Sequence, residues 1–401
     1  MAVVAGPDPG HAFPAVALCV RLREAGHAPL LLTGRRWLDR VRAEGVDAAE
    51  LPGVVAADPA ADTDPGHRLH GRAARMAPAL AGLFDGDRPD LVVADTLTAA
   101  GGLAAELAGV PWLELLPHPL QVPSVALPPP GSGLAPGRTL LGRGRDAVLR
   151  RLHARSVALG RRQRAEARAS IGLPADDPGP AYRLVATLWP LEPARPDWPA
   201  DTDVIGPLHW EPAQADLDPP PGGGSLVLVS PSTAAGGRLG LLPAALGAVQ
   251  RLRAVALPDL RLAGTVLGLE LGTSGGSEQA GGGALPQWAA VGAGRQAPLL
   301  ARAAVVVAGG GHGMLTKALS AGVPLVLVPG AGDQRDLSRR AARLGAAVVV
   351  ERPLSSARLA RAIGRVITDP AFRAAAAAVA GASAPYANPV RLCETAANRA
   401  G

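Results

Sequence analysis

The sequence predicts an α/β protein of two domains, each with its own parallel sheet. Short apolar segments alternate with longer segments of helical periodicity along the 401 residues, which is typical of parallel strands joined by helical crossovers. The segment DLDPPPGGG at residues 216–224 interrupts this alternation, because its Pro and Gly suit neither a helix nor a core. We therefore expect a first domain over 1–215, a linker over 216–224 and a second domain over 225–385, with residues 386–401 forming a helix that returns to the first domain.

Each half repeats a unit of strand, helix and strand. In the first half we expect strands at residues 2–5, 28–32, 91–94 and 112–116, and helices at 15–25, 98–108 and 138–170. In the second half we expect strands at 225–229, 265–271, 289–291, 304–307 and 325–328, and helices at 314–321, 336–344, 357–368 and 372–380. Residues 117–137 are rich in Pro and Gly and are expected to form an irregular loop, which at this length is usually functional or mobile.

The composition argues against several classes of protein. Apolar residues make up 48% of the chain, which suffices for a large core, and the net charge is +6. Aromatic residues make up only 3%, so the basic residues are not interleaved with the aromatic side chains that bind single-stranded nucleic acid. We expect no nucleic-acid partner. The Arg-dense helix at 138–170 is expected to be a solvated surface, or alternatively to face an anionic acceptor or a lipid surface.

The cysteines and the N-terminal sequence bear on the cellular location of the protein. Cys19 and Cys393 fit neither a metal-binding spacing nor a disulfide framework. The N-terminus has no signal-peptide pattern, and no apolar run approaches the ~18 residues that span a bilayer. These observations predict a cytoplasmic protein and leave a peripheral contact with a membrane open.

The most informative segment is a glycine-rich turn after the expected strand at 304–307. Gly309, Gly310, Gly311 and Gly313 surround His312 and lead directly into a helix. Glycine lets the backbone approach a ligand closely, and a helix N-terminus presents free N–H groups to an anion. The turn is therefore a candidate diphosphate site.

A second polar strand end follows this turn. Asp333 and Gln334 come after the expected strand at 325–328, and ligands of doubly wound sheets bind at the carboxyl ends of strands. An acid and an amide beside a phosphate site suit a polyhydroxyl group.

With these motifs, the sequence resembles the family 1 glycosyltransferases, which have the GT-B fold of two facing Rossmann-like domains with a central cleft. The resemblance rests on the glycine-rich turn, on the Ala321-Gly322-Val323-Pro324 stretch and on Asp333-Gln334. Arg295-Gln296 and the hydroxyl-bearing stretch from Val229 to Thr233 extend it. It covers nearly the whole chain, most specifically residues 293–350, and suggests the actinobacterial type of enzyme that glycosylates macrolides, flavonoids or lipids.

The resemblance implies a role for each part of the donor site. Asp333 and Gln334 would hold sugar hydroxyls, whereas Arg295 and Gln296 would lie at the base and ribose. The diphosphate would be held by Ser232, Gly309, Gly310, Gly311, His312 and Gly313.

Three positions depart from the family pattern. Gly309 stands where the family has His, Lys317 where it has Glu, and Ala293 where it has Trp. We expect His312 to take over the diphosphate contact; alternatively it bonds only the backbone at the helix start. Lys317 either reaches the same phosphates or is a charge on the helix surface.

The first domain offers a candidate catalytic base. His11 follows the first strand, and histidine is suited to take the proton of an acceptor hydroxyl at neutral pH. Asp95, at the end of the expected strand at 91–94, should lie on the same rim and would orient the imidazole. The resemblance gives these two residues the same roles. Asp8, in the loop before His11, is a rival base.

Other histidines carry weaker expectations. His118 follows a strand and is placed in the acceptor pocket, whereas His67 and His70 are expected in a polar loop. No pair of His or Cys has zinc spacing, so no metal site is expected, and the nucleotide sugar is the only small-molecule partner besides the acceptor.

The sequence therefore predicts an inverting, metal-independent glycosyltransferase without a cofactor. It would move a sugar from a UDP- or TDP-sugar to a hydroxyl of a small lipophilic or lipid acceptor. One alternative is a binding protein or pseudoenzyme on the same scaffold, which Gly309 and Lys317 motivate. Another is a dinucleotide-dependent oxidoreductase with Asp333 as the ribose-binding acid, which leaves Gln334 and His11 unexplained.

Overall fold

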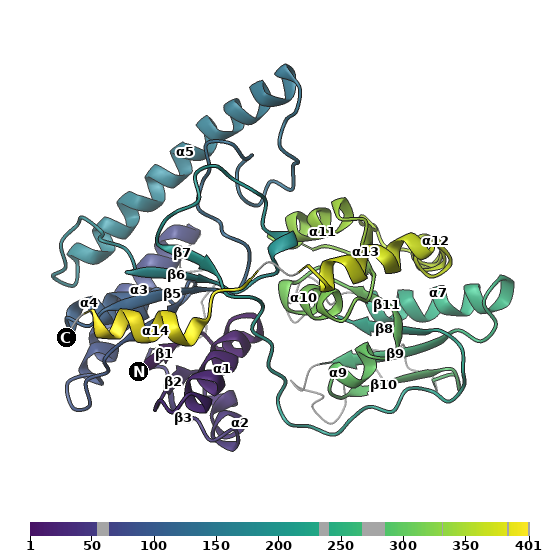
Figure 1. The fold of residues 1–401 in the computed structure, drawn as a ribbon, viewed down its shortest axis with the longest axis horizontal. Coiled ribbons are helices and arrows are strands. Elements are labelled where there is room, and N and C mark those ends of the chain that lie inside the picture. The colour runs from purple at the N-terminus through teal and green to yellow at the C-terminus, as the bar shows by residue number, and fades with distance from the viewer. Residues whose placement is uncertain (54–63, 232–239, 267–284, 331, 383–384, 400–401) are drawn as a thin grey trace. The chain divides into compact units, whose positions relative to one another are not determined.

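A computed structural model describes residues 1–401 except 54–63, 232–239, 267–284, 331, 383–384 and 400–401 (Figure 1). The chain splits into two compact units, each with a parallel sheet covered by helices. Unit 1 comprises Met1–Pro129, Ala135–Trp210 and Pro385–Gly401, and unit 2 comprises Pro130–Leu134 and Glu211–Ala384. Unit 2 thus begins ahead of the expected linker, and the C-terminal segment belongs to unit 1.

The sheet of unit 1 has seven parallel strands in the order β3-β2-β1-β4-β5-β6-β7. They are β1 (Ala2–Val4), β2 (Leu30–Thr33), β3 (Asp47–Glu50), β4 (Val92–Asp95), β5 (Trp112–Leu116), β6 (Tyr182–Val185) and β7 (Thr202–Val204). The strand order reverses between β1 and β4, so the carboxyl ends of these two strands form the switch point at which doubly wound sheets bind ligands.

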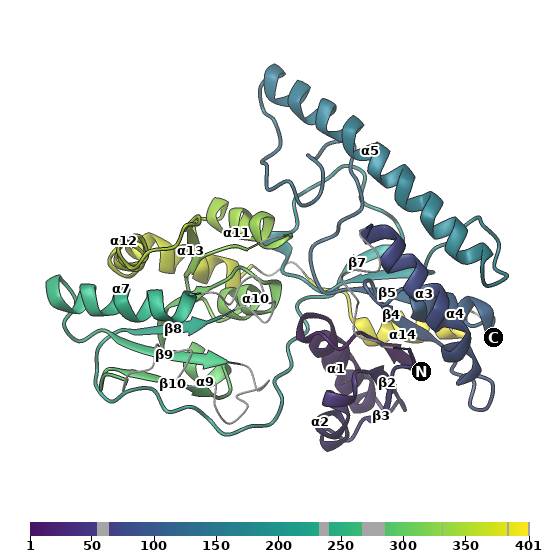
Figure 2. The same cartoon turned by 180° about the vertical axis from the view of Figure 1, so that it is seen from behind.

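Helices cover both faces of this sheet (Figures 1 and 2). On one face, α3 (Pro65–Gly82) and α4 (Ala100–Leu107) share a buried apolar core with β1 and β4. On the other, α1 (Pro9–Glu24) contacts α14 (Pro389–Asn398). The remaining helices of the unit are η1 (Arg35–Trp37), α2 (Leu38–Ala43), α5 (Leu140–Ala169), which packs on α3, and η2 (Trp189–Leu191).

Both cysteines lie in the layer formed by α1 and α14. Cys19 in α1 and Cys393 in α14 are free thiols with no exposed surface. Burial raises the pKa of both, that of Cys393 to about 12. At the edge of this layer, Nε2 of His27 lies 3.0 Å from Oε1 of Glu394 in α14.

The sheet of unit 2 has six parallel strands in the order β10-β9-β8-β11-β12-β13. They are β8 (Leu226–Ser230), β9 (Arg261–Val266), β10 (Ala289–Ala293), β11 (Ala303–Ala308), β12 (Leu325–Leu327) and β13 (Ala347–Val349). Here the order reverses between β8 and β11, which places a second switch point at their carboxyl ends.

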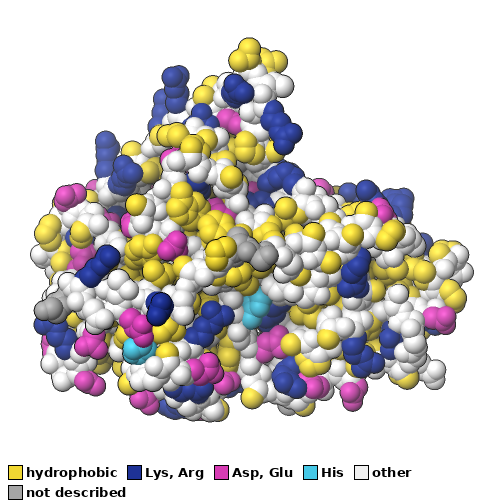
Figure 3. Space-filling model, in the orientation of Figure 1, with side chains coloured by type: hydrophobic (Ala, Val, Ile, Leu, Met, Phe, Trp, Pro, Cys, Tyr) yellow, Lys and Arg dark blue, Asp and Glu magenta, His cyan; other side chains and the backbone are white. Residues whose placement is uncertain are grey.

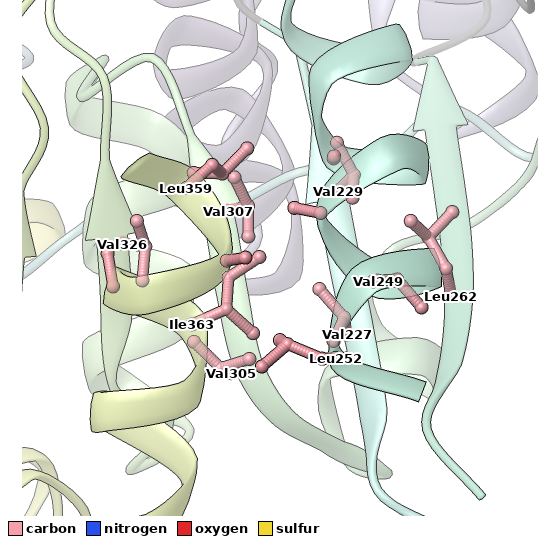
Figure 4. Packing of buried hydrophobic residues seen from close by; sticks show 14 of the residues in the cluster. Val227, Val229, Val249, Leu252, Leu262, Val305, Val307, Val326, Leu359 and Ile363 are labelled. Atoms are coloured by element: carbon pink, nitrogen blue, oxygen red, sulfur yellow. The ribbon is translucent and has the colours of Figure 1, made fainter. Parts of the chain in front are cut away.

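The core of unit 2 lies between its sheet and two helices, α7 (Leu241–Val255) and α12 (Ser356–Thr368). Figure 4 shows Val227 and Val305 of the sheet packed against Ile363 of α12. The unit is completed by α9 (Ala297–Leu300), α10 (His312–Ser320), α11 (Gln334–Arg343) and α13 (Pro370–Ala380). Among the helices that the structure describes, none is long and apolar enough to cross a membrane.

Some expectations about the elements are wrong. The first helix begins at Pro9 rather than at residue 15, because proline suits the first helical position, so His11 lies in a helical turn. His67 and His70 lie in helix α3 and not in a loop, since Asp64 caps that helix by accepting from the amides of Gly66 and His67. The expected strand at 265–271 begins earlier, at Arg261, and residues 267–271 lie outside the described residues.

Candidate functional site

A hydrogen-bonded His–Asp pair lies at the switch point of unit 1. His11 is in the first turn of α1, shortly after β1, and Asp95 is the last residue of the neighbouring strand β4. Nδ1 of His11 lies 2.7 Å from Oδ1 of Asp95. The structure thus brings together the two residues that the sequence places on one rim.

The surroundings of Asp95 define the state of the histidine. The Asp95 side chain is fully buried, and its Oδ2 accepts hydrogen bonds from the amide of Leu97 and the hydroxyl of Thr98, both at 3.1 Å. An ionised carboxylate only accepts hydrogen bonds, so Nδ1 of His11 carries the proton. In the neutral ring Nε2 is then the basic nitrogen, and the side chain is 19% exposed. This is the geometry of a general base oriented by an acid.

The rival base is placed differently. Asp8 is the N-cap residue of α1, but its side chain is exposed and makes no capping hydrogen bond. At the neighbouring Gly6, a Cβ atom would lie 3.3 Å from Oγ1 of Thr98, so the β1–α1 turn runs close to the loop that holds Asp95.

The glycine-rich turn lies at the switch point of unit 2, between β11 and α10. Gly310 has φ +80°, and a Cβ atom there would collide with Oγ of Ser338, so the fold requires glycine at this position. At Gly311 and Gly313 a Cβ atom would meet nothing within 4 Å. These two glycines therefore leave space open at the N-terminus of α10, and the N-terminus of a helix is suited to bind an anion.

Two further residues were expected at the diphosphate. His312 is the first residue of α10 and is half-buried, and its carbonyl oxygen accepts a hydrogen bond from Thr316 at 2.9 Å. Its phosphate contact stays a prediction. Ser232 lies outside the described residues.

The two residues expected at the nucleoside, Gln296 and Arg295, differ in their exposure to solvent. Gln296 is buried, and its Nε2 donates to Oγ of Ser230 at the end of β8 (3.2 Å), which places it at the switch point. Arg295 is exposed, and its Nε and Nη2 lie 2.6 and 2.9 Å from the carboxylate oxygens of Asp216.

A charge pair that the sequence did not reveal adjoins Gln296. Nζ of Lys317 lies 2.8 Å from Oε1 of Glu211 and 3.1 Å from Oε1 of Gln296. The other oxygen of Glu211 accepts from the backbone amides of Gln296 (2.9 Å) and Ala297 (3.3 Å). Burial lowers the pKa of Lys317, and the carboxylate of Glu211 opposes this shift.

Lys317 is therefore not a surface charge, because its side chain is only 10% exposed and is paired. It lies beside Gln296, the residue that the sequence predicts at the base and ribose. Glu211 had no signal in the sequence, since it precedes Lys317 by 106 positions and lies in no recognisable motif.

The two residues expected at the sugar, Gln334 and Asp333, also differ in their exposure to solvent. Gln334 is buried, and its Oε1 accepts from the amide of Gly330 at 2.9 Å, so it holds the loop after β12. Asp333 is half-buried at the N-terminus of α11 and makes no side-chain hydrogen bond to that helix. Of the two, Asp333 is the better placed to meet a hydroxyl group.

The long loop after β5 is held by three charged residues of the segment that contains η2. Glu192 accepts from the amide of Leu120 at 2.7 Å, and Arg195 donates to the carbonyl oxygen of Val122 at 2.8 Å. Asp197 accepts from Oγ of Ser124 (2.6 Å) and from the amide of Val125 (2.7 Å). Sequence reasoning missed these anchors because they lie about 70 positions beyond the loop.

His118 begins this loop. It is half-buried, and its Nδ1 donates to the carbonyl oxygen of Pro119 at 2.9 Å. Apolar side chains gather beside it: Leu116 and Leu120 pack with Trp189 and Trp198. Its place in an acceptor pocket stays a prediction.

Solved structures define the class of fold. The glycosyltransferase of kitacinnamycin has a TM-score of 0.70 at 23% identity, covering 100% of this chain and 96% of that one. VinC, solved in complex with dTDP, has a TM-score of 0.70 at 21% identity, with 100% of both chains covered. Together with the two sheet orders, these likenesses show the GT-B fold of two Rossmann-like domains.

Sequence relatives then define the enzyme. Residues 289–397 match the family described as erythromycin biosynthesis protein CIII-like, C-terminal domain. The 4'-demethylrebeccamycin synthase of Lentzea aerocolonigenes is 29% identical over 94% of this chain and 93% of its own length. The L-demethylnoviosyl transferase of Streptomyces niveus is 39% identical over 27% of this chain and 31% of its own. The resemblance seen in the sequence is confirmed: the chain is a glycosyltransferase, and the oxidoreductase alternative is wrong.

Proposed function

We propose that this enzyme transfers a sugar from a thymidine-diphosphate sugar to a hydroxyl group of a small lipophilic natural product, with inversion and without a metal ion. The observation that carries the proposal is the His11–Asp95 pair at the switch point of unit 1. Thymidine rather than uridine is favoured because VinC and the spinosyn rhamnosyltransferase SpnG were solved with thymidine diphosphate. We place the enzyme in the cytoplasm, where its two thiols stay reduced.

The proposed reaction is a single displacement. Nε2 of His11 takes the proton of the acceptor hydroxyl as its oxygen attacks the anomeric carbon, and Asp95 stabilises the imidazolium that forms. The bond from that carbon to the diphosphate oxygen breaks on the opposite side, which inverts the configuration. Backbone amides at the N-terminus of α10, with His312, stabilise the charge on the leaving diphosphate, so that the reaction needs no metal ion.

The acceptor class follows from the relatives and from the loop after β5. The name of the 4'-demethylrebeccamycin synthase refers to a small-molecule product. Leu120 and Val122 of this loop pack with Trp189 and Trp198 of the segment that contains η2. Apolar walls with a few polar groups are typical of sites for small lipophilic molecules.

The base is tested by replacing His11 and Asp95. We expect His11→Ala and Asp95→Asn each to lower kcat by about 10²–10⁴, because both remove general-base catalysis. Affinity for dTDP should not change, since the donor turn lies in unit 2. His67→Ala, at an exposed position of α3, is the matched control. Full activity in His11→Ala would exclude the proposed base, and Asp8→Asn then tests the rival.

The donor turn is tested by the shift of the unfolding temperature with dTDP and with UDP. A ligand at about 100 times its Kd stabilises by about 2.7 kcal/mol, so binding is visible in the shift. Gly311→Ala should keep the unfolding temperature and lose the dTDP shift, because its methyl group enters the open space above α10. Gly310→Ala is the contrasting variant, because its left-handed backbone and the contact with Ser338 should lower stability itself.

Two results would count against the donor site. An unchanged dTDP shift in Gly311→Ala would move the diphosphate elsewhere. Binding of dTDP without turnover of any dTDP-sugar would favour the binding-protein alternative.

A further inference from the structure

One face of α5 exposes a line of apolar side chains. Leu141, Val148, Leu152 and Leu159 follow one another at spacings of seven, four and seven residues. At about 100° per residue these spacings keep all four within about 40° of one another around the helix. Their exposed fractions are 88%, 57%, 53% and 51%. Single exposed leucines are common, but a line of four on one helix indicates a surface that binds something.

The same helix concentrates positive charge. It contains nine arginines and two acidic residues, a net charge of +7. The whole chain carries +6, so the residues outside α5 carry −1 together. In Figure 3, arginine side chains stand out from the surface at the top of the view, where Figure 1 draws α5, with hydrophobic groups between them.

Three of these arginines border the apolar line. Arg151, Arg155 and Arg162 are exposed and lie on one side of it, within about 80° around the helix. Other arginines of α5 serve the fold instead. Arg168 is buried and pairs with Glu106 at 2.7 Å, and Arg145 pairs with its neighbour Asp146 at 2.6 Å.

The C-terminal end of α5 attaches the helix to unit 1. Gln163 is buried and donates to Oδ1 of Asp64 at 3.0 Å, and Ala167 and Arg168 are buried beside it. The four residues of the apolar line remain more than half exposed beside this attachment. Its three leucines and one valine would be buried from solvent only by contact with another molecule.

We propose that this face of α5 docks on the surface of an anionic lipid bilayer. The apolar line would enter the boundary between headgroups and acyl chains, and Arg151, Arg155 and Arg162 would meet lipid phosphates. An amphipathic helix with arginine beside an aliphatic face is the pattern of interfacial helices, and anionic lipids attract such segments. The net positive charge of the chain is therefore concentrated on α5.

Other occupants fit this face less well. A second copy of the chain, docked through the same face, would place arginines against arginines, and like charges across an interface are unfavourable. Single-stranded nucleic acid stacks on aromatic side chains, and α5 contains none.

Sedimentation of the full-length protein with lipid vesicles tests the proposal. Vesicles of phosphatidylcholine with about 30% phosphatidylglycerol supply the anionic surface, and pure phosphatidylcholine vesicles are the comparison. We expect at least about tenfold tighter binding to the anionic vesicles and weaker binding as salt screens the charges.

Three variants separate the contributions. Leu141→Gln/Leu152→Gln should lose most of the binding, and Arg151→Gln/Arg155→Gln/Arg162→Gln should lose the preference for anionic lipid. Val255→Gln is the matched control, because Val255 is 81% exposed at the end of α7. All these positions are exposed, so thermal unfolding should match wild type and show that each variant is folded.

Three outcomes would overturn the proposal. The first is no binding to anionic vesicles, and the second is equal binding by Leu141→Gln/Leu152→Gln and wild type. The third is a dimer in solution that this double variant dissociates while vesicle binding is absent, which would assign the face to a second copy. None of these readouts depends on transferase activity.

Discussion

At position 317 this chain has a base where the resemblance to the family implies an acid, and the structure pairs that base with Glu211. Glu211 supplies a carboxylate from the segment at the start of unit 2 and lies between Lys317 and the amides of Gln296 and Ala297. A carboxylate thus lies beside Gln296, and it comes from another part of the chain than Lys317. The charges of Lys317 and Glu211 therefore have to be considered together.

This pairing predicts non-additive effects on stability. Lys317→Met leaves the half-buried Glu211 without its cation, which should cost about 1–3 kcal/mol of unfolding free energy. In Glu211→Gln/Lys317→Met no charge is left unpaired, so the double variant should lose less than the sum of the single variants. Urea unfolding of the four proteins measures the coupling. Arg295→Met, which breaks an exposed pair, is the control and should change stability less. Additive effects would show that the two charges act independently.

Part of the candidate site was predictable residue by residue. His11 and Asp95 were found because each follows an apolar strand, and neighbouring parallel strands end on one rim. Glu211 was not, because a carboxylate in a Pro-rich segment has no local signal, and its partners are set by the fold of unit 2. For the same reason the sequence left Lys317 between two interpretations.

Among the elements, those with strong apolar runs were predicted best. Residues 112–116 coincide with β5, and the buried run of β11 was found to within a residue at each end. Strand β6 was missed because Tyr182 and Arg183 come first in it and only Leu184 and Val185 are buried. Helix α3 was missed because its first turns carry His, Arg and Gly, whose helical signal is weak, and its Asp64 cap was overlooked.

The loop after β5 should respond to pH through Asp197. Hydrogen bonds from the Ser124 hydroxyl and the Val125 amide lower the pKa of Asp197 in the folded protein. Its stabilising contribution is then complete above the ordinary pKa of about 3.9 and is lost as pH falls through the lowered folded value. Asp197→Asn should therefore lower the unfolding temperature at pH 7, and the difference from wild type should shrink toward pH 3.

Thermal unfolding at several pH values measures this difference. Asp39→Asn is the control, because the Asp39 side chain is 99% exposed and should contribute little at any pH. A difference for Asp197→Asn that stays constant between pH 7 and pH 3 would mean that the carboxylate charge does not hold the loop.

At the scale of the whole molecule, the two units have separate cores, and the end of the chain belongs to the core of unit 1. Ala387 donates its amide to the carbonyl oxygen of Val204 in β7, and Tyr386 packs on Gly206, which has φ +77°. Pro389, Cys393 and Ala396 of α14 are buried. The C-terminal segment is thus a structural part of a unit whose other residues end at Trp210.

Truncation after residue 384 should therefore destabilise unit 1 selectively. Removing α14 exposes Cys19 and the rest of the face of α1 that it covers, so the unit-1 transition should move to lower temperature. The dTDP-dependent shift, which we assign to unit 2, should persist. Calorimetry with and without dTDP measures both. Glu394→Gln, which removes only the partly exposed contact with His27, is the control. A truncated protein with unchanged unfolding would show that α14 contributes nothing to the core.

The two cysteines make the separation of α14 from α1 measurable by chemical labelling. They are the only thiols of the chain, and both are buried in the layer of α1 and α14 with raised pKa values. An alkylating reagent reacts with them only after this layer has separated, so the rate of alkylation reports how often that happens. Isotope-free chemical labelling of the unmodified enzyme would thus give the opening free energy of its C-terminal helix, without any engineered probe.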